Sequence, residues 1–152
     1  MKISRQRLIP FLTEFLGIES IHRLPTELEI GAAERFLSLD YITIEDVAAF
    51  VDIYAPDAKL RFRPGMNVKV GLHYPMCGGE PVEACLRNIL INTDTAIPYI
   101  THIEYETLHP FTDCNGRSGR MIWLWQMLKQ DRLIAGLSFL HSWYYSSLEN
   151  SH

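Results

Sequence analysis

Apolar residues recur at helical spacing through the first third of the chain, and each set predicts an amphipathic helix. The first helix is expected over residues 5–20. The second follows Thr26, which forms a capping-box pattern with Glu29, and the third runs from Thr43 to a stop before Pro56. The apolar sets are, in order, Leu8, Phe11, Leu12, Phe15 and Leu16; Leu28, Ala32, Phe36 and Leu39; and Val47, Phe50, Val51 and Tyr54.

The pattern then changes to alternation of apolar and polar residues over 60–63 and 66–70, with Pro64 and Gly65 between them. This alternation predicts a short β-hairpin, and the Pro-Gly pair suits a type II turn. A lone hairpin is marginal in a helical chain unless it packs on something or accepts a further strand. It is therefore either a surface loop or an edge to which an extended peptide can add.

Residues 71–81 are rich in Gly and Pro and predict a loop. Helices are expected over 82–92 and 98–108, and a last one over 137–148. Between them, residues 121–128 are apolar nearly all the way round a helix, which is typical of a helix buried at the centre of a domain. The fold class is therefore mainly α with one short hairpin, as a single domain over 1–152.

Polar residues are concentrated in the stretch 109–120, HPFTDCNGRSGR, directly before the apolar helix. Free backbone N–H groups and the helix dipole favour an anion at such a helix N-terminus. Arg117 and Arg120 are three residues apart and offer forked donors that match phosphate oxygens. Asp113 would repel a phosphate unless a hard cation such as Mg²⁺ lay between them. His109 is the group suited to take a proton near neutral pH. The stretch predicts a metal–nucleotide site with a general base.

The same stretch resembles the signature of the Fic family, HPFx(D/E)GNGRxxR, and only Cys114 departs from the specified residues. The similarity runs from the segment 18–23 to Tyr144 and Tyr145. Most Fic proteins transfer AMP from ATP to a hydroxyl side chain of a target protein. The resemblance thus implies a Fic-like helical bundle, a protein adenylyltransferase activity, ATP as substrate and Mg²⁺ as cofactor.

Residue roles follow from the resemblance, position by position. His109 would deprotonate the target hydroxyl of Tyr, Thr or Ser, and Asp113 would bind Mg²⁺. The turn of Asn115 and Gly116 would hold phosphate oxygens together with Arg117, and Arg120 would hold the γ-phosphate. The related Doc proteins have Lys at the position of Gly116 and transfer phosphate, so Gly116 favours nucleotidyl transfer. In Fic proteins a hairpin called the flap holds the target, here Met66, Asn67, Val68, Lys69 and Val70.

Five further residues are candidates for regulation, adenine binding or redox sensitivity. Many Fic proteins are restrained by a glutamate that pairs with the second motif arginine; Glu19 and Glu149 come near that pattern, and neither matches it well. Tyr144 and Tyr145 either line an adenine pocket or pack in the core. Cys114 lies near a helix N-terminus and Arg117, which favours a lowered thiol pKa and sensitivity to oxidation.

Alternatives to AMP transfer are UMP or phosphocholine transfer on the same site, or a catalytically silent Fic-fold module that only binds partners. His102 and Glu106 lie at helical spacing with His109, but the sequence lacks the other ligands of a helical metal site, so both are interpreted as surface or structural residues. An antitoxin-like regulator is a further partner that the resemblance allows.

Composition and charge limit the kinds of partner and the cellular compartment expected for this protein. A net charge of −4 argues against nucleic-acid binding, and no stretch reaches the length that would predict a membrane-spanning helix. The three cysteines show no metal or redox spacing and fit a reducing compartment. A cytoplasmic protein is the expectation, with delivery into another cell as the alternative.

Overall fold

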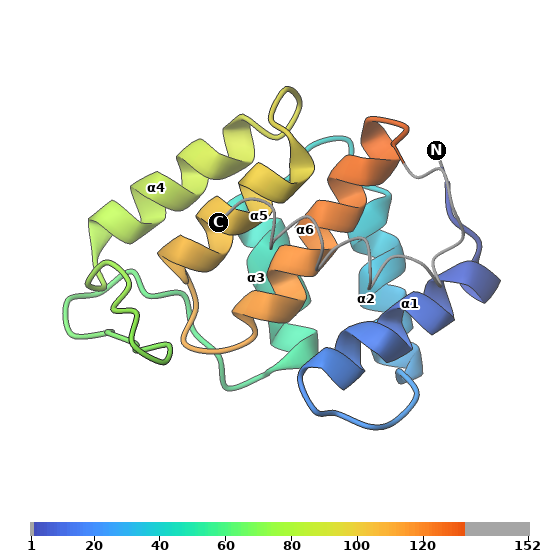
Figure 1. Cartoon of the computed structure of the whole chain (residues 1–152), viewed down its shortest axis with the longest axis horizontal. Helices are drawn as coiled ribbons and strands as arrows, with labels where there is room; N and C mark the ends of the chain where they lie inside the picture. Colours follow the sequence, from blue (N-terminus) through green and yellow to red (C-terminus); the bar gives the residue numbers. More distant parts are fainter. Residues whose placement is uncertain (1, 133–152) are drawn as a thin grey trace.

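The computed structural model describes residues 2–132, which form a mainly helical fold (Figure 1). The helices are α1 (Arg5–Ile18), α2 (Glu27–Leu37), α3 (Ile44–Tyr54), α4 (Glu80–Ile91), α5 (Pro98–Leu108) and α6 (Asn115–Lys129). The expected helix over 137–148, with Tyr144 and Tyr145, and Glu149 lie outside the described residues. Within the described part of the chain, no helix combines the length and apolar character needed to cross a membrane.

Helix α6 runs through the middle of the molecule, with α5 on one side and α1 and α2 on the other (Figure 1). Every residue from Met121 to Leu128 is buried, which confirms the prediction of a central apolar helix. Two of its polar side chains donate hydrogen bonds across the core. Trp125 Nε1 donates to the Leu39 carbonyl at 2.9 Å, and Gln126 Nε2 donates to the Thr93 carbonyl at 3.0 Å. These bonds anchor the later turns of α6 to the end of α2 and to the segment between α4 and α5.

Helices α2 and α3 begin where their caps predict. The Thr26 side chain accepts from the Glu29 N–H at 3.2 Å, and the Glu29 carboxylate accepts from the Thr26 N–H at 2.8 Å. Thr43 and Asp46 form the same reciprocal pair on α3. Leu28 was counted among the apolar positions of α2, but its side chain is 70% exposed, because Ile30 and Ala33 face the core instead.

The hairpin predicted over residues 60–70 is not formed. Leu60 makes an isolated bridge with Phe111, and Val70 makes one with His73, so the two halves do not pair with each other. The physical reason is that their backbone groups are bonded elsewhere: the Arg61 N–H donates to the Pro110 carbonyl, and the Met66 carbonyl accepts from the Arg61 side chain. The segment between α3 and α4 is a loop fastened to the turn between α5 and α6.

Candidate functional site

The turn between α5 and α6 is built from two left-handed residues. His109 follows the last residue of α5 with φ 52°, and Cys114 precedes the first residue of α6 with φ 69°. The Asn115 side chain closes the turn, since its Oδ1 accepts from the Phe111 N–H at 2.9 Å and its Nδ2 donates to the Phe111 carbonyl at 2.8 Å. The side chain of Asn115 is thus committed to the turn, which leaves backbone N–H groups of the first helical turn to meet an anion.

A cleft of about 750 Å³ lies over this turn and extends along the groove between α5 and α6, a size within the range of small-molecule sites. Of the twelve predicted site residues that the structure describes, it brings together seven. Its lining comprises Glu19, Val70, His73, His102, Ile103, Glu106, Thr107, His109, Thr112, Asp113, Cys114, Asn115, Gly116 and Arg120. Among the predicted residues, Arg117 and the flap residues other than Val70 do not line it.

The imidazole of His109 is half-buried at the mouth of the cleft. Its Nδ1 lies 3.2 Å from the carbonyl oxygen of Glu106. A carbonyl can only accept, so this hydrogen bond requires the proton on Nδ1 and leaves Nε2 of the neutral ring free to accept one. Burial lowers the pKa of His109, as does the nearby charge of Arg61. The geometry and the charge state both suit a general base.

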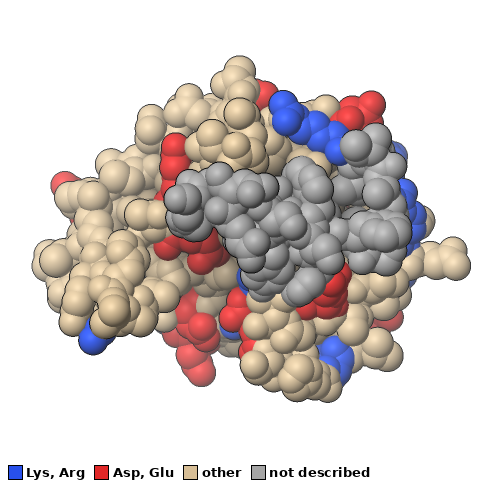
Figure 2. Space-filling view, in the orientation of Figure 1, with Lys and Arg blue, Asp and Glu red and all other residues tan. Residues whose placement is uncertain are grey.

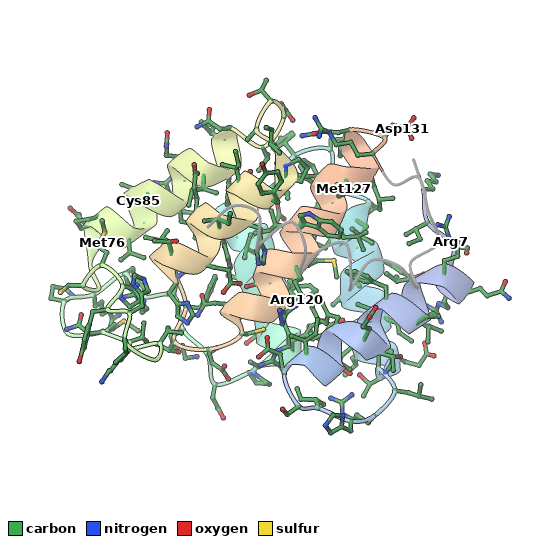
Figure 3. All side chains as sticks on the ribbon, in the orientation of Figure 1. Arg7, Met76, Cys85, Arg120, Met127 and Asp131 are labelled. Carbon is green, nitrogen blue, oxygen red and sulfur yellow. The ribbon has the colours of Figure 1, made fainter. Side chains whose placement is uncertain are left out.

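Arg120 projects from the first part of α6 toward the end of α1 (Figure 3). It is 7% exposed, and its Nη2 forms an ion pair with Oε1 of Glu19, the residue that caps the end of α1. A Cβ at Gly116 would collide with that Glu19 oxygen and would lie 2.9 Å from Arg120 Nη2. The bare backbone of Gly116 therefore allows the carboxylate and the guanidinium to approach the first turn of α6.

Arg117 takes a different direction from Arg120. Its Nη1 donates to the Tyr54 carbonyl at 3.1 Å, at the end of α3, and its Nη2 lies 3.8 Å from Oδ2 of Asp113. The side chain is buried and is not part of the cleft lining. A role on phosphate oxygens, which the resemblance assigns to it, would require this side chain to leave the Tyr54 carbonyl.

Asp113 is the carboxylate available to a cation at the rim of the cleft. Its side chain is 71% exposed, and Oδ1 accepts from the Cys114 N–H at 2.7 Å. Among residues 2–132, no three His, Cys, Asp or Glu side chains are grouped as metal ligands. A cation at Asp113 would therefore take its other ligands from phosphate and water, which is how Mg²⁺ is bound with nucleotides. The donor set fits Mg²⁺ brought with a phosphate ligand.

Cys114 corrects a prediction. Its side chain is buried, and this burial raises the thiol pKa to about 12, which outweighs the lowering by Arg117. The sequence places the thiol near a helix N-terminus and an arginine, but solvation decides the balance: the charged thiolate loses its water. Cys114 is a neutral thiol packed beneath the turn, and the expected low pKa is wrong.

His102 and Glu106 are the cleft residues that the sequence led us to interpret as surface or structural. Burial lowers the pKa of His102 to about 4 and raises that of Glu106 to about 7. His102 Nε2 and Glu106 Oε1 lie 3.8 Å apart, and with a neutral imidazole this contact is not an ion pair at neutral pH. The sequence feature that could have predicted both as cleft residues is their helical spacing with His109, because this spacing places all three on one side of α5 and its C-terminal end.

Two further residues were missed. His73, in the segment between α3 and α4, lies in the cleft wall, and its Nε2 is 3.1 Å from the Thr107 carbonyl. Arg61 is fully buried and contacts the backbone of the α5–α6 turn. Neither belongs to a recognisable motif. In comparisons with known proteins, no protein-family model and no curated protein matches the chain.

Proposed function

We propose that this chain is a Fic-type protein adenylyltransferase, which transfers AMP from ATP to a hydroxyl side chain of a target protein. The observation that carries the proposal is the cleft in which His109, Asp113, the start of α6 and Arg120 meet. A base, a carboxylate for a cation, backbone donors and a guanidinium are the groups that phosphoryl and nucleotidyl transfer need around a polyphosphate.

In the proposed reaction the target hydroxyl attacks the α-phosphorus of ATP. The bond from the hydroxyl oxygen to phosphorus forms, the bond from the α-phosphorus to the bridging oxygen breaks, and pyrophosphate leaves. His109 takes the hydroxyl proton on Nε2, because Nδ1 is engaged with the Glu106 carbonyl. Asp113 would hold Mg²⁺, which supplies charge neutralisation on the phosphates. The N–H groups at Asn115 and Gly116 bind phosphate oxygens, and Arg120 binds the γ-phosphate.

The ion pair between Glu19 and Arg120 gives this proposal a resting state. Glu19 occupies the guanidinium that the γ-phosphate would use, and it lies in the cleft lining itself. A carboxylate at that place also repels phosphate. Glu19 therefore restrains ATP binding, and productive binding requires Glu19 to move away. This is the inhibitory role that the resemblance to Fic proteins suggests for Glu19.

The segment between α3 and α4 is the proposed docking surface for the target. Its exposed apolar side chains are Phe62, Val70, Leu72, Tyr74 and Met76. Figure 2 shows few charges on the left part of this face, where Figure 1 places the segment. Val70 and His73 of this segment line the cleft. An extended target peptide laid along it would bring its hydroxyl to His109, although the segment is a loop and not a hairpin.

The test is incubation with cell lysate and ATP labelled in either the α or the γ position. Glu19→Gln serves as the unrestrained enzyme and Glu19→Gln with His109→Ala as the matched control. Label on protein from the α position alone, lost in the control, is the expected result. Label from the γ position alone indicates a kinase, and no label from either position contradicts the proposal.

The silent module remains the second candidate, because Arg117 is turned away from the cleft and Arg120 is occupied. A silent module without nucleotide binding shows no change in melting temperature with Mg²⁺ and ATP, whereas any ligand that binds the folded state raises it. UMP or phosphocholine transfer is distinguished by the same labelling with UTP or a choline donor in place of ATP.

A further inference from the structure

Arg61 is a buried guanidinium whose side chain bonds only with backbone. Its side chain has no exposed surface. Nε donates to the His109 carbonyl at 2.6 Å and Nη2 to the Leu108 carbonyl at 2.7 Å. Nη1 donates to the carbonyls of Met66 at 3.1 Å and Met76 at 2.7 Å. Each acceptor is a backbone carbonyl, so the charge is solvated by peptide dipoles in place of water.

The contacts of Arg61 with α5 are those of a helix C-cap. The last carbonyls of a helix lack partners within the helix and carry the negative end of its dipole, and a cation there is favourable. Arg61 goes further, because one of its acceptors belongs to His109 itself. His109 has a left-handed backbone, which is unfavourable for a residue with a Cβ. The bond at the His109 carbonyl helps to hold this conformation and, with it, the direction of the imidazole.

The other two acceptors of Arg61 are the carbonyls of Met66 and Met76, in the segment between α3 and α4. They are ten residues apart in the sequence. The Arg61 backbone adds bonds on both sides: its N–H donates to the Pro110 carbonyl at 2.8 Å, and its carbonyl accepts from the Gly79 N–H at 2.9 Å. One side chain thus connects the loop that would receive a target with the turn that carries His109.

We propose that Arg61 is a positioning residue, which fixes His109 in its left-handed turn. Through Arg61, the orientation of the His109 imidazole depends on the conformation of the segment 62–78. The role of His109 as a general base rests on the proposed function. The coupling of the segment to the His109 imidazole through Arg61 does not. A target that settles the segment would improve the alignment of His109 through this guanidinium.

The charge of Arg61 has a second effect on His109. Burial is the largest cause that lowers the pKa of His109; among the titratable groups near the imidazole, Arg61 and His73 also lower it and Asp113 raises it. Removing the guanidinium therefore raises the pKa of His109, whereas Arg61→Lys keeps the charge and loses the fork of donors. The two effects, charge and orientation, can be measured separately.

The first experiment compares Arg61→Lys and Arg61→Met with the parent and with Arg63→Lys, a matched change at an exposed arginine of the same segment. The His109 ring signals are followed by NMR as pH is varied, after assignment with His109→Ala. We expect both Arg61 variants to move the His109 signals, with a higher pKa for Arg61→Met only. The kcat for transfer should fall about tenfold or more while ATP affinity stays, and Arg63→Lys should match the parent.

A second variant tests the linkage from the other end and does not touch Arg61. A Cβ at Gly78 would lie 2.6 Å from the carbonyl oxygens of Arg63 and Met66, so Gly78→Ala forces a backbone shift directly beside an acceptor of Arg61. We expect it to move the His109 signals, and we expect Gly17→Ala in α1, where a Cβ meets no atom within 4 Å, to leave them in place.

The proposal is overturned if Gly78→Ala and Arg61→Lys both leave the His109 signals of the folded protein unchanged. It is also overturned if ATP affinity falls in parallel with kcat, which is the mark of a merely structural role. If both Arg61 variants fail to fold, Gly78→Ala decides alone. Absence of transfer by the parent would contradict the proposed function only, since the NMR signals are read without any substrate.

Discussion

At the scale of single residues, the proposed reaction has His109 act on the acceptor hydroxyl and not hold the nucleotide. We therefore expect His109→Ala to reduce transfer by about 10²–10⁴-fold, the usual loss with a general base, while ATP affinity measured by calorimetry stays near that of the parent. His22→Ala, at an exposed histidine, is the control. Labelling by His109→Ala at the parental rate would exclude the proposed mechanism.

Glu106 gives a pH dependence whose sign is set by burial. Its pKa is raised to about 7 in the folded protein, against an ordinary value of 4.5. The folded state therefore binds the proton more tightly than the unfolded state, and stability falls as pH rises from about 4.5 through 7. We expect Glu106→Gln to gain melting temperature over the parent at pH 8 and little at pH 4.5. Glu104→Gln, exposed on the same helix, should show no such trend.

Cys114 should be inert, because its thiol is buried and neutral. With iodoacetamide at pH 8, we expect exposed Cys77 to be alkylated and Cys114 to be protected until the protein is unfolded. Mass spectrometry of the peptides gives the extent at each site. Equal alkylation of Cys114 and Cys77 in the native protein would restore the reactive-thiol interpretation.

The sequence predicted part of the cleft lining, because His109, Asp113 and Gly116 lie within one short stretch and local chain geometry brings them together. It did not predict properties that depend on distant packing. The Cys114 pKa depends on how deeply neighbouring helices bury the turn, and the directions of Arg117 and Arg120 depend on acceptors at Tyr54 and Glu19. No local pattern carries that information.

At the scale of elements, α5 was predicted with the bounds that it has in the structure, and α2 and α3 begin at their predicted caps. Helix periodicity and capping are local, so they can be read from sequence. The prediction of a hairpin was wrong because alternation of apolar and polar residues indicates an extended backbone but not the segment with which it forms hydrogen bonds. Here the partners of the extended residues Leu60 and Arg61 lie in the α5–α6 turn.

The packing of α5 on α6 depends on Gly119. A Cβ there would lie 2.8 Å from Glu106 Oε1 and 3.1 Å from both His102 Cε1 and Tyr105 Cδ1. We expect Gly119→Ala to destabilise the fold by about 1–3 kcal/mol through overpacking, measured by urea unfolding. Gly17→Ala in α1 meets no atom within 4 Å and should stabilise by up to about 1 kcal/mol through helix propensity. The same sign for both changes would contradict this account.

At the scale of the whole molecule, Glu19 and Arg120 join the end of the first helix to the central one, across 101 residues of sequence. We expect Glu19→Gln to raise affinity for ATP and the rate of labelling about tenfold, since a charged hydrogen bond is worth about 1.5–3 kcal/mol. Calorimetry and labelling provide the two measurements. A Glu19→Gln protein with parental affinity would show that the ion pair does not compete with the nucleotide.

The order in which the chain folds follows from the positions of these residues along it. The residues from His102 to Arg120 belong to one helix–turn–helix unit, whose contacts are short in sequence, and such contacts form early in folding. The contact between Glu19 and Arg120 requires closure of a far longer loop, which is entropically slower. During refolding, the part of the cleft between α5 and α6 is therefore expected to form before the ion pair of Glu19 with Arg120, so in the proposed enzyme a refolding molecule passes through a brief unrestrained stage.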